Sequence, residues 1–234
     1  MSFHRRPLIT VLLLLLCLTL PLAPARADYY SEPADLVERA TMVYKGFLAD
    51  PNMEWFQRNV DRARGIFIVP QMLRGGFIIG GSGGRGVLLA QDAATAKWSA
   101  PAFYSMGSVS LGFQAGADAS EIILLIMTDR GLNAMLSTDY KIGADVAVAA
   151  GPIGASAKAQ TADILAFGRS QGMYGGVSIE GAATSPLDNW NRQYYGKPVQ
   201  VFDILINQKW NNSQADPLRQ MLPKPKRNVQ PIGR

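Results

Sequence analysis

Carboxylates are the main side chains in this sequence that could perform acid–base chemistry. The chain has a single cysteine, Cys17, and a single histidine, His4, both within its first 27 residues. A glycosidase needs two carboxylates that face each other across a cleft, and spacing along the chain does not indicate such a pair. Helix caps and solvent-facing strand positions are the simpler interpretation. The acidic residues concerned are Asp118, Glu121, Asp129, Asp139, Asp145 and Glu180.

The first 27 residues have the features of an export signal. Arg5 and Arg6 precede an uncharged apolar stretch over residues 8–22, and residues 25–27 (Ala-Arg-Ala) are typical of a cleavage site. The apolar stretch is shorter than the roughly 20 residues of a transmembrane helix. We therefore expect an exported protein, periplasmic or peripheral on the envelope membrane, that begins at residue 28.

Cleavage after residue 27 has a large consequence for chemistry, because it removes both Cys17 and His4. Disulfides, thiolate or imidazole metal sites and Ser-His or Cys-His nucleophile pairs are then excluded. An alternative is a lipoprotein acylated on Cys17, although Leu16 stands where lipoprotein processing needs a small residue. We expect no enzymatic activity and no cofactor.

The formal net charge of +5 at pH 7 reflects the two ends of the chain more than its body. The signal contributes Arg5, Arg6 and Arg26, and residues 216–234 contribute five further cations: Arg219, Lys224, Lys226, Arg227 and Arg234. Acidic residues slightly outnumber basic ones in between. The basic isoelectric point therefore does not indicate a nucleic-acid-binding body.

The glycine-rich segment over residues 80–86 contains two formal motifs. Gly81, Gly83 and Gly86 fit a dinucleotide-binding pattern, and Ser82 fits a hydrolase nucleophile pattern. The first needs a helix to follow, whereas the next residues (VLLAQD) predict a strand, and the second needs a histidine partner. We predict a hairpin turn here, with Arg85 presenting a cation at its tip.

Hydrophobic periodicity predicts an α+β protein. A helix over residues 31–49 with Ser31 as N-cap is followed by a second helix that begins at Asp50, and C-terminal helices are expected over 187–195 and 199–210. Between them, a short helix over 129–137 interrupts a series of strands at 66–69, 77–79, 87–91, 108–114, 121–127, 141–149, 164–169 and 173–180. Their spacing predicts a curled, mostly antiparallel, glycine-rich sheet packed with N-terminal and C-terminal helices. The single domain is expected to span 28–215, and the Pro-rich basic tail over 216–234 is expected to be disordered.

The first helix is amphipathic and could contact a membrane. In that arrangement Arg39 and Lys45 would lie near lipid headgroups, with Phe47 and Leu48 in the acyl boundary. The alternative is that its apolar face belongs to the protein core.

Six sequence blocks, in this order, resemble the SYLF lipid-binding domain family, which is also described as an actin-binding domain in fungal endocytic proteins. The blocks are RARGIFIVP (62–70), GGFIIGGSGGRGVLLAQD (75–92), WSAPAFYSMGSVSLGFQAG (98–116), AAGPIG (149–154), GRSQGMYGGVSIEGA (168–182) and NRQYYG (191–196). The resemblance implies a non-enzymatic domain that binds phospholipid membranes, to which an N-terminal amphipathic helix contributes. The chain departs from the eukaryotic pattern at Ala155, where a basic residue is usual, so phosphoinositide preference is not carried over.

The leading hypothesis is reversible binding of anionic phospholipid headgroups at a membrane face of the cell envelope. The candidate lipid-binding residues are Arg39, Lys45, Phe47, Leu48, Arg74, Arg85 and Arg169; the cations among them lie on the first helix or beside glycine-rich turns. The alternative is an envelope scaffold that recruits a protein partner through its basic tail without binding lipid.

Overall fold

The computed structural model describes residues 32–76, 79–111, 116–137, 142–143, 146–150, 161–170, 173–174 and 181–224. Residues 32 onward cluster as one unit of the chain. The predicted export signal lies outside the described residues, as do Asp139, Asp145 and Glu180.

The N-terminal helical pair is confirmed. Helix α2 (Pro33–Ala49) has Glu32 as its N-cap, not the predicted Ser31, because Pro33 takes the first helical position. Asp50 ends α2 and accepts a hydrogen bond from the Asn52 backbone N–H at 2.9 Å. This Asp-Pro start leads through η1 (Pro51–Met53) into α3 (Glu54–Asn59) and η2 (Val60–Arg62).

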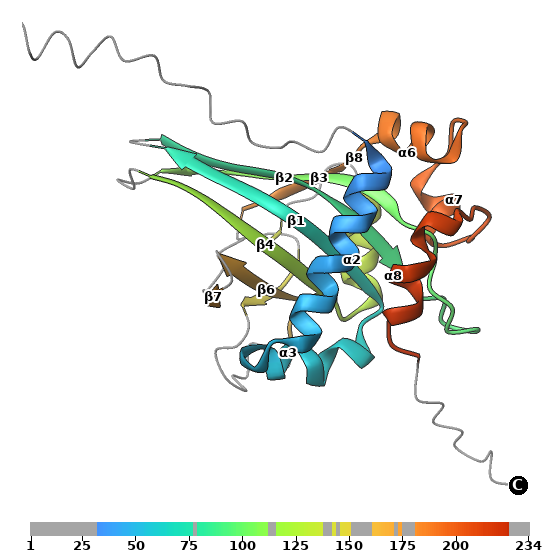
Figure 1. Ribbon diagram of the computed structural model, residues 1–234, viewed down its shortest axis with the longest axis horizontal. Helices are drawn as coiled ribbons and strands as arrows, with labels where there is room; N and C mark the ends of the chain where they lie inside the picture. Colours follow the sequence, from blue (N-terminus) through green and yellow to red (C-terminus); the bar gives the residue numbers. More distant parts are fainter. Residues whose placement is uncertain are drawn as a thin grey trace, which may run out of the picture. The chain divides into compact units, whose positions relative to one another are not determined.

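The centre of the fold is a curled sheet, which confirms the α+β prediction (Figure 1). Its long strands are β1 (Gly65–Gly76), β2 (Ile79–Ala90), β3 (Ala102–Leu111) and β4 (Gly116–Ile126), with β5 (Val148–Ala150), β6 (Ile164–Ser170) and β8 (Ala183–Pro186) completing it. The strand order is β5-β6-β4-β1-β2-β3-β8, and β7 (Met173–Tyr174) pairs with β6. Among these pairs only β5 and β6 run parallel.

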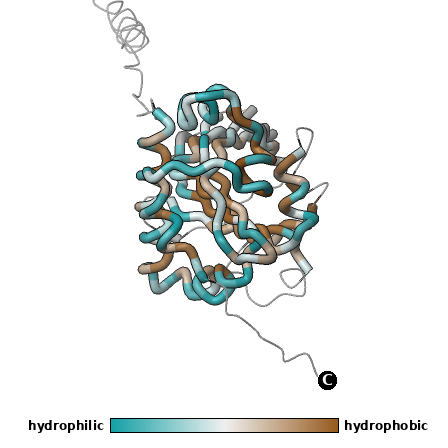
Figure 2. The backbone as a smooth tube through the Cα atoms, turned by 90° about the vertical axis from the view of Figure 1, so that its right-hand side faces the viewer, coloured by the Kyte–Doolittle hydropathy of each residue, from teal (hydrophilic) through white to brown (hydrophobic). Residues whose placement is uncertain are grey.

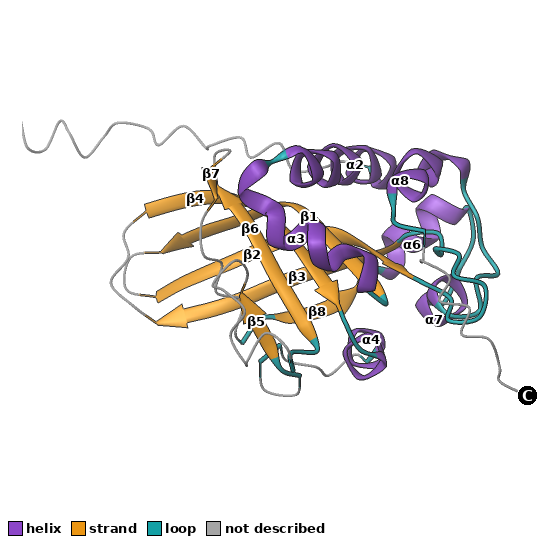
Figure 3. Ribbon diagram, turned by 90° about the horizontal axis from the view of Figure 1, so that it is seen from below, coloured by secondary structure: helices purple, strands orange, loops and turns teal. Residues whose placement is uncertain are grey.

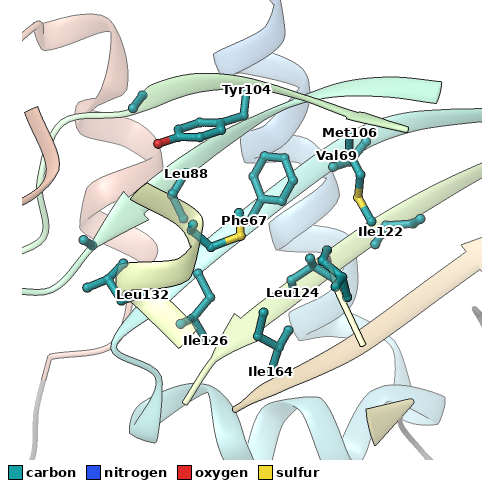
Figure 4. Packing of buried hydrophobic residues seen from close by; sticks show 14 of the residues in the cluster. Phe67, Val69, Leu88, Tyr104, Met106, Ile122, Leu124, Ile126, Leu132 and Ile164 are labelled. Atoms are coloured by element: carbon teal, nitrogen blue, oxygen red, sulfur yellow. The ribbon is translucent and has the colours of Figure 1, made fainter. Parts of the chain in front are cut away.

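Both faces of the sheet are covered by helices (Figure 3). One face carries Phe67, Leu88 and Leu124 in a cluster that also receives Leu132 of α4 (Asp129–Leu136) and Ile204 of α7 (Val201–Leu205) (Figure 4). On the other face α2 packs against β1 and β2. Figure 2 shows hydrophobic segments gathered in the interior and hydrophilic ones outside.

The predicted hairpin turn at residues 80–86 is wrong, because this segment lies inside β2. Strand β1 shifts register at a bulge between Ile68 and Gln71, which brings its backbone close to β2. A Cβ atom on Gly84 would lie 2.5 Å from the Gln71 carbonyl oxygen and 2.8 Å from Val69 Cγ1. Glycine is therefore required there by the close approach of two strands.

The C-terminal helices pack against the end of the sheet where β1 begins and β2 ends. In α6 (Asp188–Tyr195), the buried Asn191 accepts from the Phe103 N–H at 2.9 Å and donates to the Phe103 carbonyl at 3.3 Å. Helix α7 is shorter than the predicted helix over 199–210.

The predicted disorder of the tail is wrong for residues 216–224. After η3 (Ser213–Ala215), helix α8 (Asp216–Met221) packs beside α2 and buries Leu218. Leu222 is also buried, and Trp98 Nε1 donates to the Pro223 carbonyl at 2.9 Å. Apolar burial thus fixes this segment to the domain, and only residues 225–234 of the predicted tail lie outside the described residues.

Candidate functional site

The first candidate surface is the exposed side of α2. Its opposite side is core, where Leu36, Ala40 and Tyr44 are fully buried. On the exposed side, acidic residues come first (Asp35, Glu38), and Arg39 and Lys45 follow them. Two large apolar side chains after Arg39 also reach solvent, Met42 at 58% and Leu48 at 37% exposure. This combination of cations and exposed apolar groups is typical of helices that lie on a lipid surface.

Phe47 does not belong to that surface. Its side chain is fully buried, and its ring meets Phe56 edge to face at a centroid separation of 5.6 Å. The expectation of Phe47 in an acyl boundary is corrected, because this ring lies on the face of α2 that packs into the core. Of the predicted apolar pair, only Leu48 is accessible.

Arg169 lies on β6, and its side chain makes structural contacts at the C-terminal end of α2. Its side chain is 16% exposed and donates from Nε and Nη2 to Glu121 Oε2, at 2.8 and 2.5 Å. It also pairs with Asp50 at 3.7 Å and lies over the Phe47 ring at 5.2 Å. These contacts tie β6 and β4 to the junction of α2 and η1, so the guanidinium is already occupied within the protein.

The two remaining candidate cations, Arg74 and Arg85, lie on neighbouring strands of the sheet but not at paired positions. Arg85 of β2 lies over the Trp190 ring of α6 at 4.6 Å from its centroid. Arg74 lies near the end of β1, where its register partners are Ser82 and Asp118, and it is exposed. The structure therefore brings Arg39, Lys45 and Leu48 together on one helix and leaves Arg74 and Arg85 as separate positions.

Among the carboxylates considered for catalysis, the three that lie in the described ranges, Asp118, Glu121 and Asp129, have partners that account for them. Glu121 pairs with Arg169, and Asp129 pairs with Arg64 at 2.8 Å. The Asp118 carboxylate lies 3.1 Å from the hydroxyl oxygens of both Ser120 and Ser170, which also share a hydrogen bond with each other, so one hydroxyl donates to Asp118 and the other donates to its serine neighbour. Within the described ranges, no three His, Cys, Asp or Glu side chains gather in a group that could hold a metal ion.

Buried tyrosines do not supply acid–base groups near neutral pH. Burial raises the pKa of the Tyr44 phenol, and the nearby Asp61 charge raises it further. Burial likewise raises the pKa of Tyr104, with a smaller contribution from Asp188. Both phenols therefore stay neutral over the physiological range.

Sequence reasoning missed a second candidate surface, a groove between the turn after β2 and α8. The groove has a volume of about 1100 Å³ and is lined by residues 93–98 on one side and by Asp216, Arg219, Gln220, Leu222 and Lys224 on the other. The groove was missed because residues 216–234 were expected to be disordered. The helical spacing of Leu218 and Leu222 after the Asp216-Pro217 start was the available signal.

Comparison with known proteins decides the family. The family described as "Ysc84: Las17-binding protein actin regulator" matches residues 107–224, half of the chain. The chain belongs to the Ysc84 family. This confirms the SYLF resemblance drawn from the six sequence blocks.

Relatives in the Ysc84 family include animal and yeast proteins. SH3 domain-containing YSC84-like protein 1 of Bos taurus is 27% identical over 169 residues, which cover 70% of this chain and 49% of that protein, and its Homo sapiens counterpart gives the same figures. Protein YSC84 of Saccharomyces cerevisiae is 29% identical over 169 residues, covering 69% and 36% of the two chains. The chain thus spans about half the length of the animal relatives. Among its described helices, none is both long and apolar enough to cross a membrane.

Proposed function

We propose that this protein is a non-enzymatic module that binds anionic phospholipid surfaces through the exposed side of α2 over residues 39–48. One observation carries the proposal: Arg39 and Lys45 share this part of the helix with the exposed apolar side chains Met42 and Leu48. The cations would meet headgroup phosphates while the apolar groups enter the interface.

The expected binding is reversible. Each Lys or Arg close to an anionic membrane contributes roughly 1 kcal/mol, and this attraction falls off within about 10 Å at 0.1 M salt. Two cations and two partly exposed apolar side chains thus give a weak, salt-sensitive association. The buried face of α2 stays in the core, so α2 binds as part of the folded domain.

The cellular setting is part of the proposal. An export signal over residues 1–27 would place the domain in the periplasm or peripherally on the envelope membrane, where phospholipid headgroups are available. The family description names Las17 binding and actin regulation. An envelope scaffold role with a protein partner therefore remains the second candidate function.

Co-sedimentation with liposomes tests the lipid proposal. Residues 28–234 are mixed with vesicles of phosphatidylcholine alone or with phosphatidylglycerol, across a salt series. We expect binding only to the anionic vesicles, weakening as salt increases.

A matched pair of charge reversals identifies the surface. Arg39→Glu with Lys45→Glu should abolish sedimentation, whereas Lys97→Glu with Lys224→Glu makes the same change in net charge at residues outside α2 and should leave it intact. Met42→Ser with Leu48→Ser should weaken binding even at low salt. Equal binding of neutral and anionic vesicles, or equal loss in both charge-reversal variants, would remove the proposal.

A further inference from the structure

We propose that the groove between residues 93–98 and α8 is a docking site for an extended acidic peptide segment of a partner protein. The proposal is independent of the lipid surface on α2. It rests on the shape, charge and rigidity of the groove.

The first wall of the groove is a fixed turn after β2. The Asp92 carboxylate accepts from the Thr95 N–H at 2.6 Å, the Thr95 hydroxyl at 2.7 Å and the Ala94 N–H at 3.1 Å. The Ala96 N–H donates to the Asp92 carbonyl, and Gln208 Nε2 donates to the Lys97 carbonyl. A wall held in this way loses little conformational freedom when a ligand binds.

The second wall is α8 with residues 222–224, locked to the first wall by Arg219. Arg219 Nη2 donates to the Trp98 carbonyl at 3.1 Å. Its Nη1 donates to Asn211 Oδ1 at 2.6 Å and to Asp216 Oδ1 at 3.3 Å. Arg219 thus joins the two walls and neutralises Asp216, the acidic side chain that lines the groove.

The remaining cations of the lining are Lys97 and Lys224, one on each wall, and both are exposed. The lining also includes the methyl groups of Ala94 and Ala96 and the side chain of Leu222, together with the polar side chains of Thr95 and Gln220. The groove therefore offers positive charge on both walls as well as apolar and hydrogen-bonding groups. An extended peptide with alternating acidic and apolar side chains complements this pattern.

Two observations favour a peptide over a phosphate group. The guanidinium of Arg219 already donates from both of its terminal nitrogens, so it is not available as a bidentate phosphate clamp. The volume of about 1100 Å³ also exceeds the roughly 300–1,000 Å³ of small-ligand pockets and suits several residues of a peptide.

The chain's own C-terminal residues do not match the groove. Residues 225–234 contain Lys226, Arg227 and Arg234 and lack acidic side chains. Their charge has the same sign as that of Lys97 and Lys224, so they do not complement the groove. Charge complementarity thus selects an acidic segment from another protein.

Fluorescence anisotropy with residues 28–234 tests the proposal. The probe is a labelled synthetic peptide in which Asp and Glu alternate with Leu, and the control peptide has Lys and Arg in place of the acids. We expect saturable binding of the acidic peptide alone. Lys97→Glu with Lys224→Glu should weaken it at least about tenfold, equivalent to roughly 1.4 kcal/mol.

Two further variants separate docking from general charge attraction. Ala94→Trp fills the groove without changing charge and should also weaken peptide binding, whereas Arg39→Glu with Lys45→Glu on α2 should leave it unchanged. Absence of binding, equal binding of both peptides or an equal effect of the α2 and groove variants would overturn the proposal. Loss of liposome binding in the groove variant without any peptide binding would assign the groove to lipid instead.

Discussion

The two halves of the long strands have opposite surroundings, although the same backbones run through both. In the first half, Ile66, Phe67, Ile68 and Val69 of β1 are fully buried, because helices cover both faces of the sheet. In the second half, Arg74 and Gly75 are exposed, and the strands extend past α2 (Figure 1). Burial on both faces gives continuous apolar runs, whereas the uncovered half is glycine-rich and polar.

Short cross-strand hydrogen bonds replace apolar packing in the uncovered half. Ser82 and Ser108 share a hydrogen bond of 2.7 Å between β2 and β3, and Ser120 and Ser170 share one of 2.8 Å between β4 and β6. Such pairs stabilise a sheet by only about 0.2–1 kcal/mol each. The covered half therefore supplies most of the stability of the domain, and the bulge in β1 marks the boundary between the halves.

Gly84 lies at this boundary, and its replacement should have the largest effect. In Gly84→Ala the new methyl group would overlap the Gln71 carbonyl and Val69 Cγ1, and strand pairing holds the backbone of Gln71 opposite Arg85 and that of Val69 opposite Ile122. We expect a loss of about 3 kcal/mol in the free energy of unfolding. Urea denaturation followed by circular dichroism measures it. A loss below about 1 kcal/mol would show that the strands separate easily at the bulge.

Sequence reasoning predicted the first helix correctly but predicted the wrong structure for the glycine-rich segment that contains Gly84. The amphipathic period of residues 31–49 predicted α2 because burial of one face follows directly from the spacing of apolar side chains. The glycines at 80–86 predicted a turn because a turn and a close strand crossing both require small residues. A turn and a close strand crossing are distinguished only by the position of the bulge in β1, and that bulge depends on pairing between strands.

For the candidate site, sequence reasoning found the cations of α2 but could not assign its sides in full. Phe47 and Leu48 are adjacent in sequence, yet one is core and the other is exposed. Arg169 was grouped with the surface cations, whereas the fold pairs it with Glu121 and Asp50. The groove depends on contacts between residues more than 100 positions apart, such as Trp98 with Pro223, which no local pattern reveals.

Replacement of Arg169 should have an intermediate effect, because it joins the boundary of the sheet to the end of α2. Arg169→Met leaves Glu121 and the largely buried Asp50 without their cation, and we expect a loss of about 2 kcal/mol. Arg58→Met is the matched control, since Arg58 and Glu54 form an exposed pair at 3.5 Å that should contribute less than about 0.5 kcal/mol. Equal effects of the two replacements in thermal unfolding would contradict a structural role for Arg169.

Gly83 gives the smallest expected effect and the sharpest contrast, because it directly precedes Gly84 on the same strand. It lies in the uncovered half of the strands, and a Cβ atom there would find nothing within 4 Å. Gly83→Ala therefore adds no overlap and reduces the freedom of the unfolded chain, so we expect a gain of about 0.4–1 kcal/mol. The same urea experiment measures it, with an unchanged denaturant slope as evidence that the folded state is preserved. If Gly83→Ala were as damaging as Gly84→Ala, the uncovered half would be packed against another part of the protein, and the contrast between the two halves of the sheet would fail.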